Sequence, residues 1–133
     1  MANRKQKAHY QKFHEWQKRA EDDIRAMEAM SKEGGLPNPI CFHAQQSAEK
    51  YLKGFLTFHD AEFAKIHSLI QLLDQCMALD HEFASLKDEV VFLNTFYIET
   101  RYPGDYPAFS TKEAKQAYEA TLRVKDFVLE KIK

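Results

Sequence analysis

The residues best suited to bind a phosphate group lie in the segment YIETRYPGDYP, from Tyr97 to Pro107. The guanidinium of Arg101 presents a planar fork of N–H donors, and the following Pro–Gly turn can expose backbone N–H groups to an anion. Tyr97, four residues earlier, would share a helix face with Arg101, while Tyr102 and Tyr106 could stack on a base. Alternatively, Arg101 only complements the dipole of a helix that ends there, and the tyrosines only pack.

A second set of polar residues recurs at about one-turn spacing in HAQQSAEKYLKGFL, where Gln46, Lys50 and Lys53 would form the edge of a helix. This edge is either a solvated helix face or a phosphate-binding surface that meets Arg101 across a groove. His67 precedes the next helix, where it acts either as a local cap or packed residue, or as a ligand contact near Arg101. We therefore take all of these residues as candidates for a nucleotide or phosphate site.

Other kinds of chemistry lack a matching pattern. The remaining histidines form no HExxH or i,i+4 pair, and no glycine-rich phosphate loop or nucleophile elbow occurs. Cys41 and Cys76 lack the spacing of metal ligands, and we expect both to be buried, reduced thiols. We predict no metal and no cofactor.

The 133 residues carry a formal net charge of −1, so any binding of phosphate must come from a local cluster. No apolar run is long enough to span a bilayer. The basic start of the chain lacks the apolar stretch of a signal peptide. We therefore expect a cytoplasmic protein with no membrane contact.

Hydrophobic spacing of the helical type fills the stretches between two proline–glycine clusters, at residues 34–39 and 103–107. No stretch alternates with period two. We predict an all-α fold, with one domain over residues 1–133, in an up-and-down bundle of four long helices with one short helix inserted. The first expected helix covers about residues 8–32, and the second has Ala44 to Phe55 on one face. Later helices start after the caps Ser68, Asp80 and Ser110, and Arg101 lies in the last turn of the fourth.

Two details of this bundle can be anticipated. Gly54, inside the second helix, costs about 1 kcal/mol relative to alanine, so a neighbouring helix should approach closely there. The fourth helix is apolar beyond one stripe, because Val91, Phe92, Phe96 and Ile98 lie off its main face. Its second side would contact either another helix of the chain or another subunit, and we predict a homodimer that uses it.

Three motifs in order carry a family resemblance: HAQQSAEKYLKGFL (43–56), IHSLIQLL (66–73) and YIETRYPGDY (97–106). Together they make residues 8–131 resemble the HEPN domain, a family named for its occurrence in higher eukaryotes and prokaryotes. The resemblance implies a helical bundle that commonly dimerises and that acts in nucleotide binding or RNA cleavage. It also implies a minimal nucleotidyltransferase as partner, as the two halves of a split enzyme or as a toxin–antitoxin pair.

The RNA-cleaving members of this family carry an arginine followed after four to six residues by a histidine. Here Arg101 matches the arginine, but no histidine occurs after His81. We therefore favour a non-catalytic, dimeric, nucleotide-binding subunit. The alternatives are a divergent metal-independent RNase, in which His67 or Tyr106 handles protons, and a structural dimer without ligand.

Overall fold

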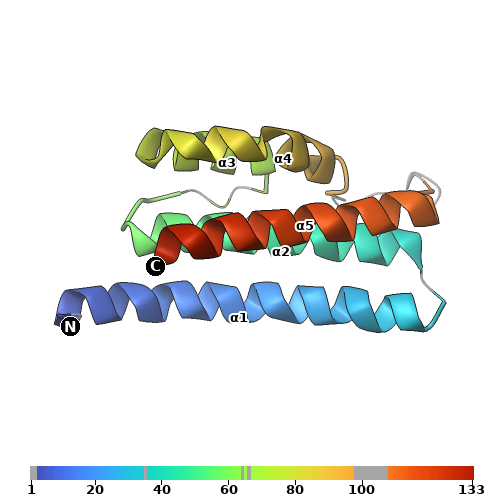
Figure 1. The fold of residues 1–133 in the computed structure, drawn as a ribbon, viewed down its shortest axis with the longest axis horizontal. Helices are drawn as coiled ribbons and strands as arrows, with labels where there is room; N and C mark the ends of the chain where they lie inside the picture. Colours follow the sequence, from blue (N-terminus) through green and yellow to red (C-terminus); the bar gives the residue numbers. More distant parts are fainter. Residues whose placement is uncertain (1–2, 35, 64, 66, 98–107) are drawn as a thin grey trace.

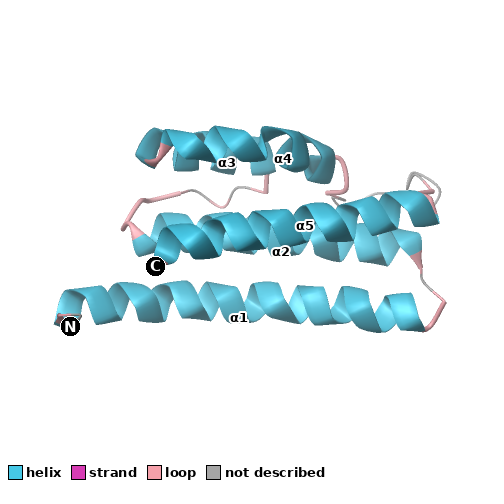
Figure 2. Ribbon diagram, in the orientation of Figure 1, coloured by secondary structure: helices cyan, strands magenta, loops and turns pink. Residues whose placement is uncertain are grey.

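The computed structural model describes residues 3–34, 36–63, 65, 67–97 and 108–133. Within these ranges helices are the regular secondary structure, as predicted, and no strand occurs (Figure 2). None of the described helices is both long and apolar enough to cross a lipid bilayer. The elements are α1 (Arg4–Lys32), α2 (Pro37–Phe58), α3 (Leu69–Leu79), the 3₁₀ helix η1 (His81–Leu86), α4 (Lys87–Asn94) and α5 (Thr111–Ile132).

The three long helices α1, α2 and α5 lie side by side, and α3, η1 and α4 form a shorter layer over them (Figure 1). Helix α2 is the centre of the bundle, because it packs extensively against α1 and α5 and also contacts α3 and α4. More than half of its residues are buried, including four polar ones. The N-terminal end of α1 projects beyond the other long helices (Figure 1).

Local sequence signals set the ends of several helices. Asn3 and Gln6 form a capping box, so α1 begins four residues earlier than predicted. Its end is marked by Gly34, whose positive φ of 94° suits glycine just past a helix C-terminus. Ser68 caps α3, and Ser110 forms the expected capping box with Glu113 at the start of α5.

The expected fourth helix differs from the prediction. Asp80 caps η1 rather than an α-helix, and α4 ends at Asn94 instead of continuing to Arg101. After Asn94 the chain tightens into i→i−3 turns, in which the Thr95 hydroxyl and the Phe96 N–H bond the carbonyls of Phe92 and Leu93. Tyr97 therefore lies outside α4. The predicted site residues Arg101, Tyr102 and Tyr106, and also Ile98, lie outside the described residues.

The same turn places Phe96 in the core of the protomer. Its side chain is fully buried and meets the rings of Phe92 and Phe109 edge-on, with centroids 5.0 and 4.8 Å away. Assigning Phe96 to a surface for a second subunit was therefore wrong, because contacts within the chain cover it. Phe92 is half-buried, and Val91 stays exposed on α4.

Both cysteines are free and buried, as predicted. Burial raises the pKa of the Cys76 thiol to about 12, and burial together with the Glu113 carboxylate raises that of Cys41 to about 12. Neither side chain forms a reactive thiolate near neutral pH.

Helix α1 approaches α2 closely at Gly54, as predicted from a glycine inside a helix. A Cβ atom there would lie 3.1 Å from Phe13 Cδ2 and 3.1 Å from Trp16 Cβ. Both neighbours belong to α1, so the missing side chain sets the distance between the two helices.

Replacing Gly54 with valine should lower the free energy of unfolding by about 1–3 kcal/mol, because the added atoms force α1 away from α2. Urea unfolding followed by circular dichroism measures the loss. Ala29→Val, at an exposed position of α1, is the control and should cost only the difference in helix propensity, about 0.5 kcal/mol. Equal losses in the two variants would contradict the close approach.

Candidate functional site

A row of polar residues runs along the buried face of α2. Gln45, Glu49 and Lys53 recur every four residues, and all three are buried. Burial of charged groups is costly unless they are paired and hydrogen-bonded. Their partners come from the connection between α2 and α3, where His67 lies. We call Gln45, Glu49, Lys53 and His67 the Glu49 network.

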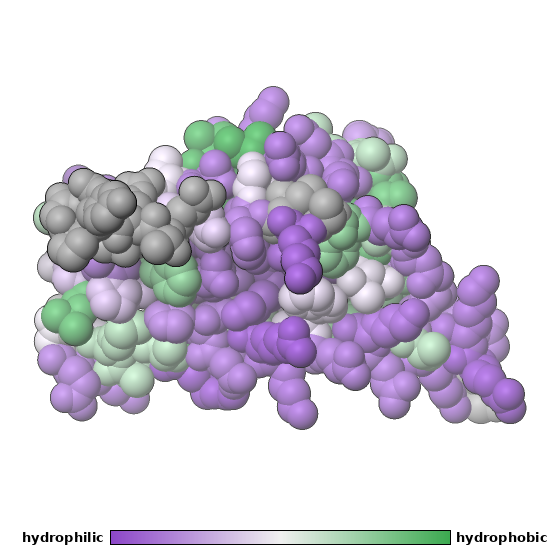
Figure 3. Space-filling view, turned by 180° about the vertical axis from the view of Figure 1, so that it is seen from behind, coloured by the Kyte–Doolittle hydropathy of each residue, from purple (hydrophilic) through white to green (hydrophobic). Residues whose placement is uncertain are grey.

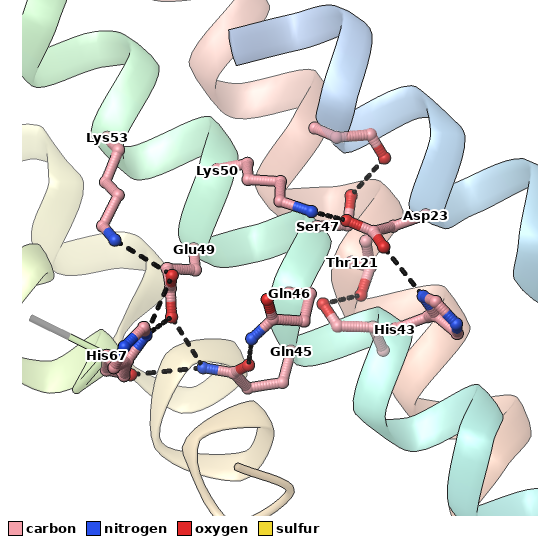
Figure 4. A network of polar contacts seen from close by, with 12 residues as sticks. Asp23, His43, Gln45, Gln46, Ser47, Glu49, Lys50, Lys53, His67 and Thr121 are labelled. Atoms are coloured by element: carbon pink, nitrogen blue, oxygen red, sulfur yellow. Dashed lines mark hydrogen bonds and ion pairs between the residues drawn. The ribbon is translucent and has the colours of Figure 1, made fainter. Parts of the chain in front are cut away.

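The Glu49 carboxylate is the centre of this network (Figure 4). Lys53 Nζ lies 3.0 Å from Oε2, and Gln45 Nε2 donates to Oε1 over 3.3 Å. His67 Nδ1 lies 3.3 Å from both carboxylate oxygens. Because an ionised carboxylate only accepts hydrogen bonds, Nδ1 must carry a proton here, and a neutral His67 then presents Nε2 as an acceptor.

His67 is held by its backbone as well as by its ring. Gln45 Nε2 also donates to the His67 carbonyl over 3.2 Å. The imidazole stacks on the Tyr97 ring, with centroids 5.0 Å apart and planes inclined by 12°. Half of the His67 side chain stays exposed to solvent. The fold thus positions a solvent-accessible imidazole through three separate contacts.

The start of α3 is tied to the end of α4 beside these rings. The backbone N–H of Leu69 donates to Asn94 Oδ1 over 2.9 Å. This bond links the segment that follows His67 to the segment that precedes Tyr97. The two rings are therefore brought together by elements far apart in the sequence.

Lys53 sits in a partly aromatic environment. Its ammonium lies 5.9 Å from the Trp16 ring centre and 5.8 Å from that of Phe63, while Arg19 lies over Trp16 at 5.6 Å. Only 9% of the Lys53 side chain is exposed. A phosphate would have to compete with Glu49 for this charge.

Lys50 belongs to a different cluster, between α1 and α2 (Figure 4). The buried Asp23 carboxylate accepts from Lys50 Nζ over 2.6 Å and from His43 Nδ1 over 2.7 Å. Gln46 instead donates to Gln45 Oε1 over 2.6 Å. The structure thus divides the predicted edge, with Gln46 and Lys53 at the Glu49 network and Lys50 at Asp23.

Two carboxylates of these clusters, those of Glu49 and Asp23, were not identified from the sequence. Glu49 precedes Lys53 by four residues, a spacing that stabilises an ion pair on a helix, and this signal was available. Asp23 lies in a different helix from both of its partners, so only the packing of α1 on α2 reveals it. Within the described residues, no three His, Cys, Asp or Glu side chains are placed so that they could hold a metal ion.

A family model and two solved structures are similar to this chain over most of its length. The model of the HEPN domain matches residues 13–132. The crystal structure of ST0689, an archaeal HEPN homologue, is 29% identical and superposes with a TM-score of 0.71, over 91% of this chain and 98% of that one. The crystal structure of TT1696 from Thermus thermophilus is also 29% identical, with a TM-score of 0.73 over 90% and 97% of the two chains. No curated protein matches.

Replacing Glu49 with alanine should lower the free energy of unfolding by about 3–5 kcal/mol, because it leaves the buried Lys53 without a counter-charge. Asp22→Ala removes an exposed partner of Arg25 and should cost less than about 1 kcal/mol. The combined change Glu49→Leu with Lys53→Met should recover much of the loss, since an apolar pair replaces the ion pair. Urea unfolding of all three variants measures these values, and equal losses for Glu49→Ala and Asp22→Ala would contradict the buried pairing.

Proposed function

Because this chain belongs to the HEPN domain family, we propose that it is a nucleotide-binding helical subunit that partners a small nucleotidyltransferase. The observation that best supports this proposal is the stack of His67 on Tyr97, which leaves half of the His67 side chain exposed to solvent. Tyr97 also begins the sequence segment that contains Arg101. An imidazole can donate to a phosphate when protonated, and aromatic rings offer surfaces for a base.

A purely structural role accounts for only part of this arrangement. The bond from Gln45 to the His67 carbonyl is enough to fix the backbone of the α2–α3 connection. It does not account for a ring that is half exposed, stacked and held at Nδ1 by a buried carboxylate. Such positioning is typical of a side chain that must meet a ligand in one orientation.

In the proposed complex, the nucleotidyltransferase supplies carboxylates and magnesium, and this chain supplies Arg101, His67 and Tyr97. The two proteins would form a split enzyme or a toxin–antitoxin pair. We place the contact of a homodimer on the outer face of α4, where Val91 is 49% exposed and Phe92 is half-buried. Lys50 and Lys53 contribute less to binding in this proposal, because each is already paired with a carboxylate.

Titration with ATP by calorimetry tests the site. His67→Ala and Arg101→Ala should each weaken binding about ten- to a hundredfold, since a hydrogen bond to a charged group contributes roughly 1.5–3 kcal/mol. His81→Ala and Lys112→Ala, which change an exposed histidine and an exposed lysine elsewhere, should leave the affinity unchanged. Equal affinity in all five proteins, or no binding by the wild type, would contradict the proposed site.

A second function, a divergent metal-independent RNase, is favoured by one observation. Glu49 fixes the proton of His67 on Nδ1, which orients Nε2 as the acceptor that a general base requires. In this role Nε2 would take the proton of a ribose 2′-hydroxyl as its oxygen attacks the adjacent phosphorus. A 2′,3′-cyclic phosphate forms, and the displaced 5′-oxygen takes a proton from water. Arg101 would hold the phosphate oxygens.

We expect little or no cleavage of RNA by the isolated protein, because the histidine that follows the arginine in RNA-cleaving members is absent. Structured and single-stranded RNAs incubated with the protein in chelator, and separated on denaturing gels, measure this. Robust cleavage that is lost in both His67→Ala and Arg101→Ala would make the RNase the favoured function and nucleotide binding the second.

A further inference from the structure

The positive charge of the chain is concentrated at one end. Residues 4–19 contain six Lys or Arg side chains and a single acidic one, Glu15, while the rest of the chain has 13 basic and 19 acidic side chains. All six basic side chains are exposed. They lie on the N-terminal half of α1, whose first residues project beyond the other long helices (Figure 1), and Figure 3 shows this projecting end, at the lower right, as a hydrophilic surface.

Three of these cations form one stripe. Lys5, Lys12 and Arg19 recur every seven residues, so they lie along one edge of α1 at intervals of about 10 Å. We call these three residues the α1 edge. Its charge is only weakly compensated within the described residues, because Lys12 Nζ lies 3.9 Å from Asp60 and both side chains are more than half exposed.

The α1 edge leads toward the α2–α3 connection. Asp60, the neighbour of Lys12, lies just after α2. Further along, the Arg19 guanidinium rests on Trp16, and the Trp16 ring meets Phe63 with centroids 6.2 Å apart. Trp16 and Phe63 are both partly exposed. The edge therefore ends at two aromatic rings.

Contacts continue from these rings to the candidate site. Lys53 lies over both Trp16 and Phe63, and it pairs with Glu49. Glu49 holds His67, which stacks on Tyr97. The exposed cations and partly exposed rings of α1 are thus linked to the His67–Tyr97 pair through the buried Lys53–Glu49 ion pair.

We propose that the α1 edge binds the phosphate backbone of a single-stranded nucleic acid and leads the strand to His67 and Tyr97. Cations that track the backbone, followed by aromatic rings that accept unstacked bases, are the features by which proteins bind single strands. The last step, delivery to His67 and Tyr97, rests on the proposed function, whereas binding along α1 does not. RNA and DNA share this backbone chemistry, so the experiment includes both.

The other three of the six basic residues provide a matched control. Arg4, Lys7 and Lys18 lie on the same N-terminal half of α1 but further round the helix, on the side where Glu21 pairs with Lys125 of α5 at 2.7 Å. Neutralising them removes the same charge from the same helix while leaving the α1 edge intact. A difference between the two triple variants therefore reports position rather than net charge.

The test compares binding of a fluorescein-labelled 12-nucleotide RNA, and of the DNA of the same sequence, by anisotropy at several salt concentrations. Changing Lys5, Lys12 and Arg19 to glutamine should weaken binding at least tenfold in 0.1 M salt and reduce the slope of log K against log salt by about two, since each phosphate contact in a single strand contributes about 0.7. The change of Arg4, Lys7 and Lys18 to glutamine should weaken binding less than threefold. Equal binding of RNA and DNA supports the backbone contact, and so does a preference for one of them, which also identifies the strand.

Equal losses in the two triple variants, an unchanged salt slope, or no binding by the wild type at low salt would overturn the proposal. A change in the sedimentation of the protein alone, seen only in the α1-edge variant, would also overturn it, because the edge would then serve a protein contact. ATP titration of the same variants separates the two proposals. Unchanged ATP affinity with weakened RNA binding is the expected result, and failure of ATP binding in the wild type affects only the proposed nucleotide site.

Discussion

The burial of α2 on several sides is the constraint on which the rest of the structure depends. A helix packed against α1, α3, α4 and α5 at once cannot leave its polar groups in water, so each must find a partner within the protein. The Glu49 network and the Asp23 cluster both meet this requirement. So do two hydroxyl groups, which bond backbone carbonyls over 3.0 and 3.1 Å: that of Ser47 bonds Ala20, and that of Thr121 bonds Ala44.

Local features of the fold could be predicted because their causes are local. The caps at Ser68 and Ser110, the left-handed Gly34 and the close approach at Gly54 follow from neighbouring residues or from helix geometry. The site could not be predicted in the same way. Glu49 receives His67 from a connection 18 residues away, and Trp16 and Phe63 cover Lys53 from other segments. The inward turn of Phe96 likewise depends on how the chain leaves α4.

The proposed site combines one residue that matches the family pattern with groups that are positioned by the packing of the described helices. Arg101 matches the arginine of RNA-cleaving HEPN domains, while the histidine expected after it is missing. His67 comes before Arg101 in the sequence instead of after it. It lies in the α2–α3 connection and is held by a buried carboxylate. Its stack on Tyr97 lies beside the bond between Leu69 and Asn94 that joins α3 to α4. In the proposed site, ligand recognition would therefore use the same contacts as the packing of the helices.

The uneven distribution of charge along α1 also has a physical consequence for the molecule as a whole. A protein with a net charge of −1 exerts almost no monopole field, but a basic projecting helix end opposite an acidic body gives it a large electric dipole moment. In the field of a polyanion such a molecule is rotated before it is attracted, so the helix end faces the polymer at the first encounter. The dipole acts over about one Debye length, roughly 8 Å at physiological ionic strength. It therefore selects the orientation of approach, whereas the short-range contacts determine how long the encounter lasts.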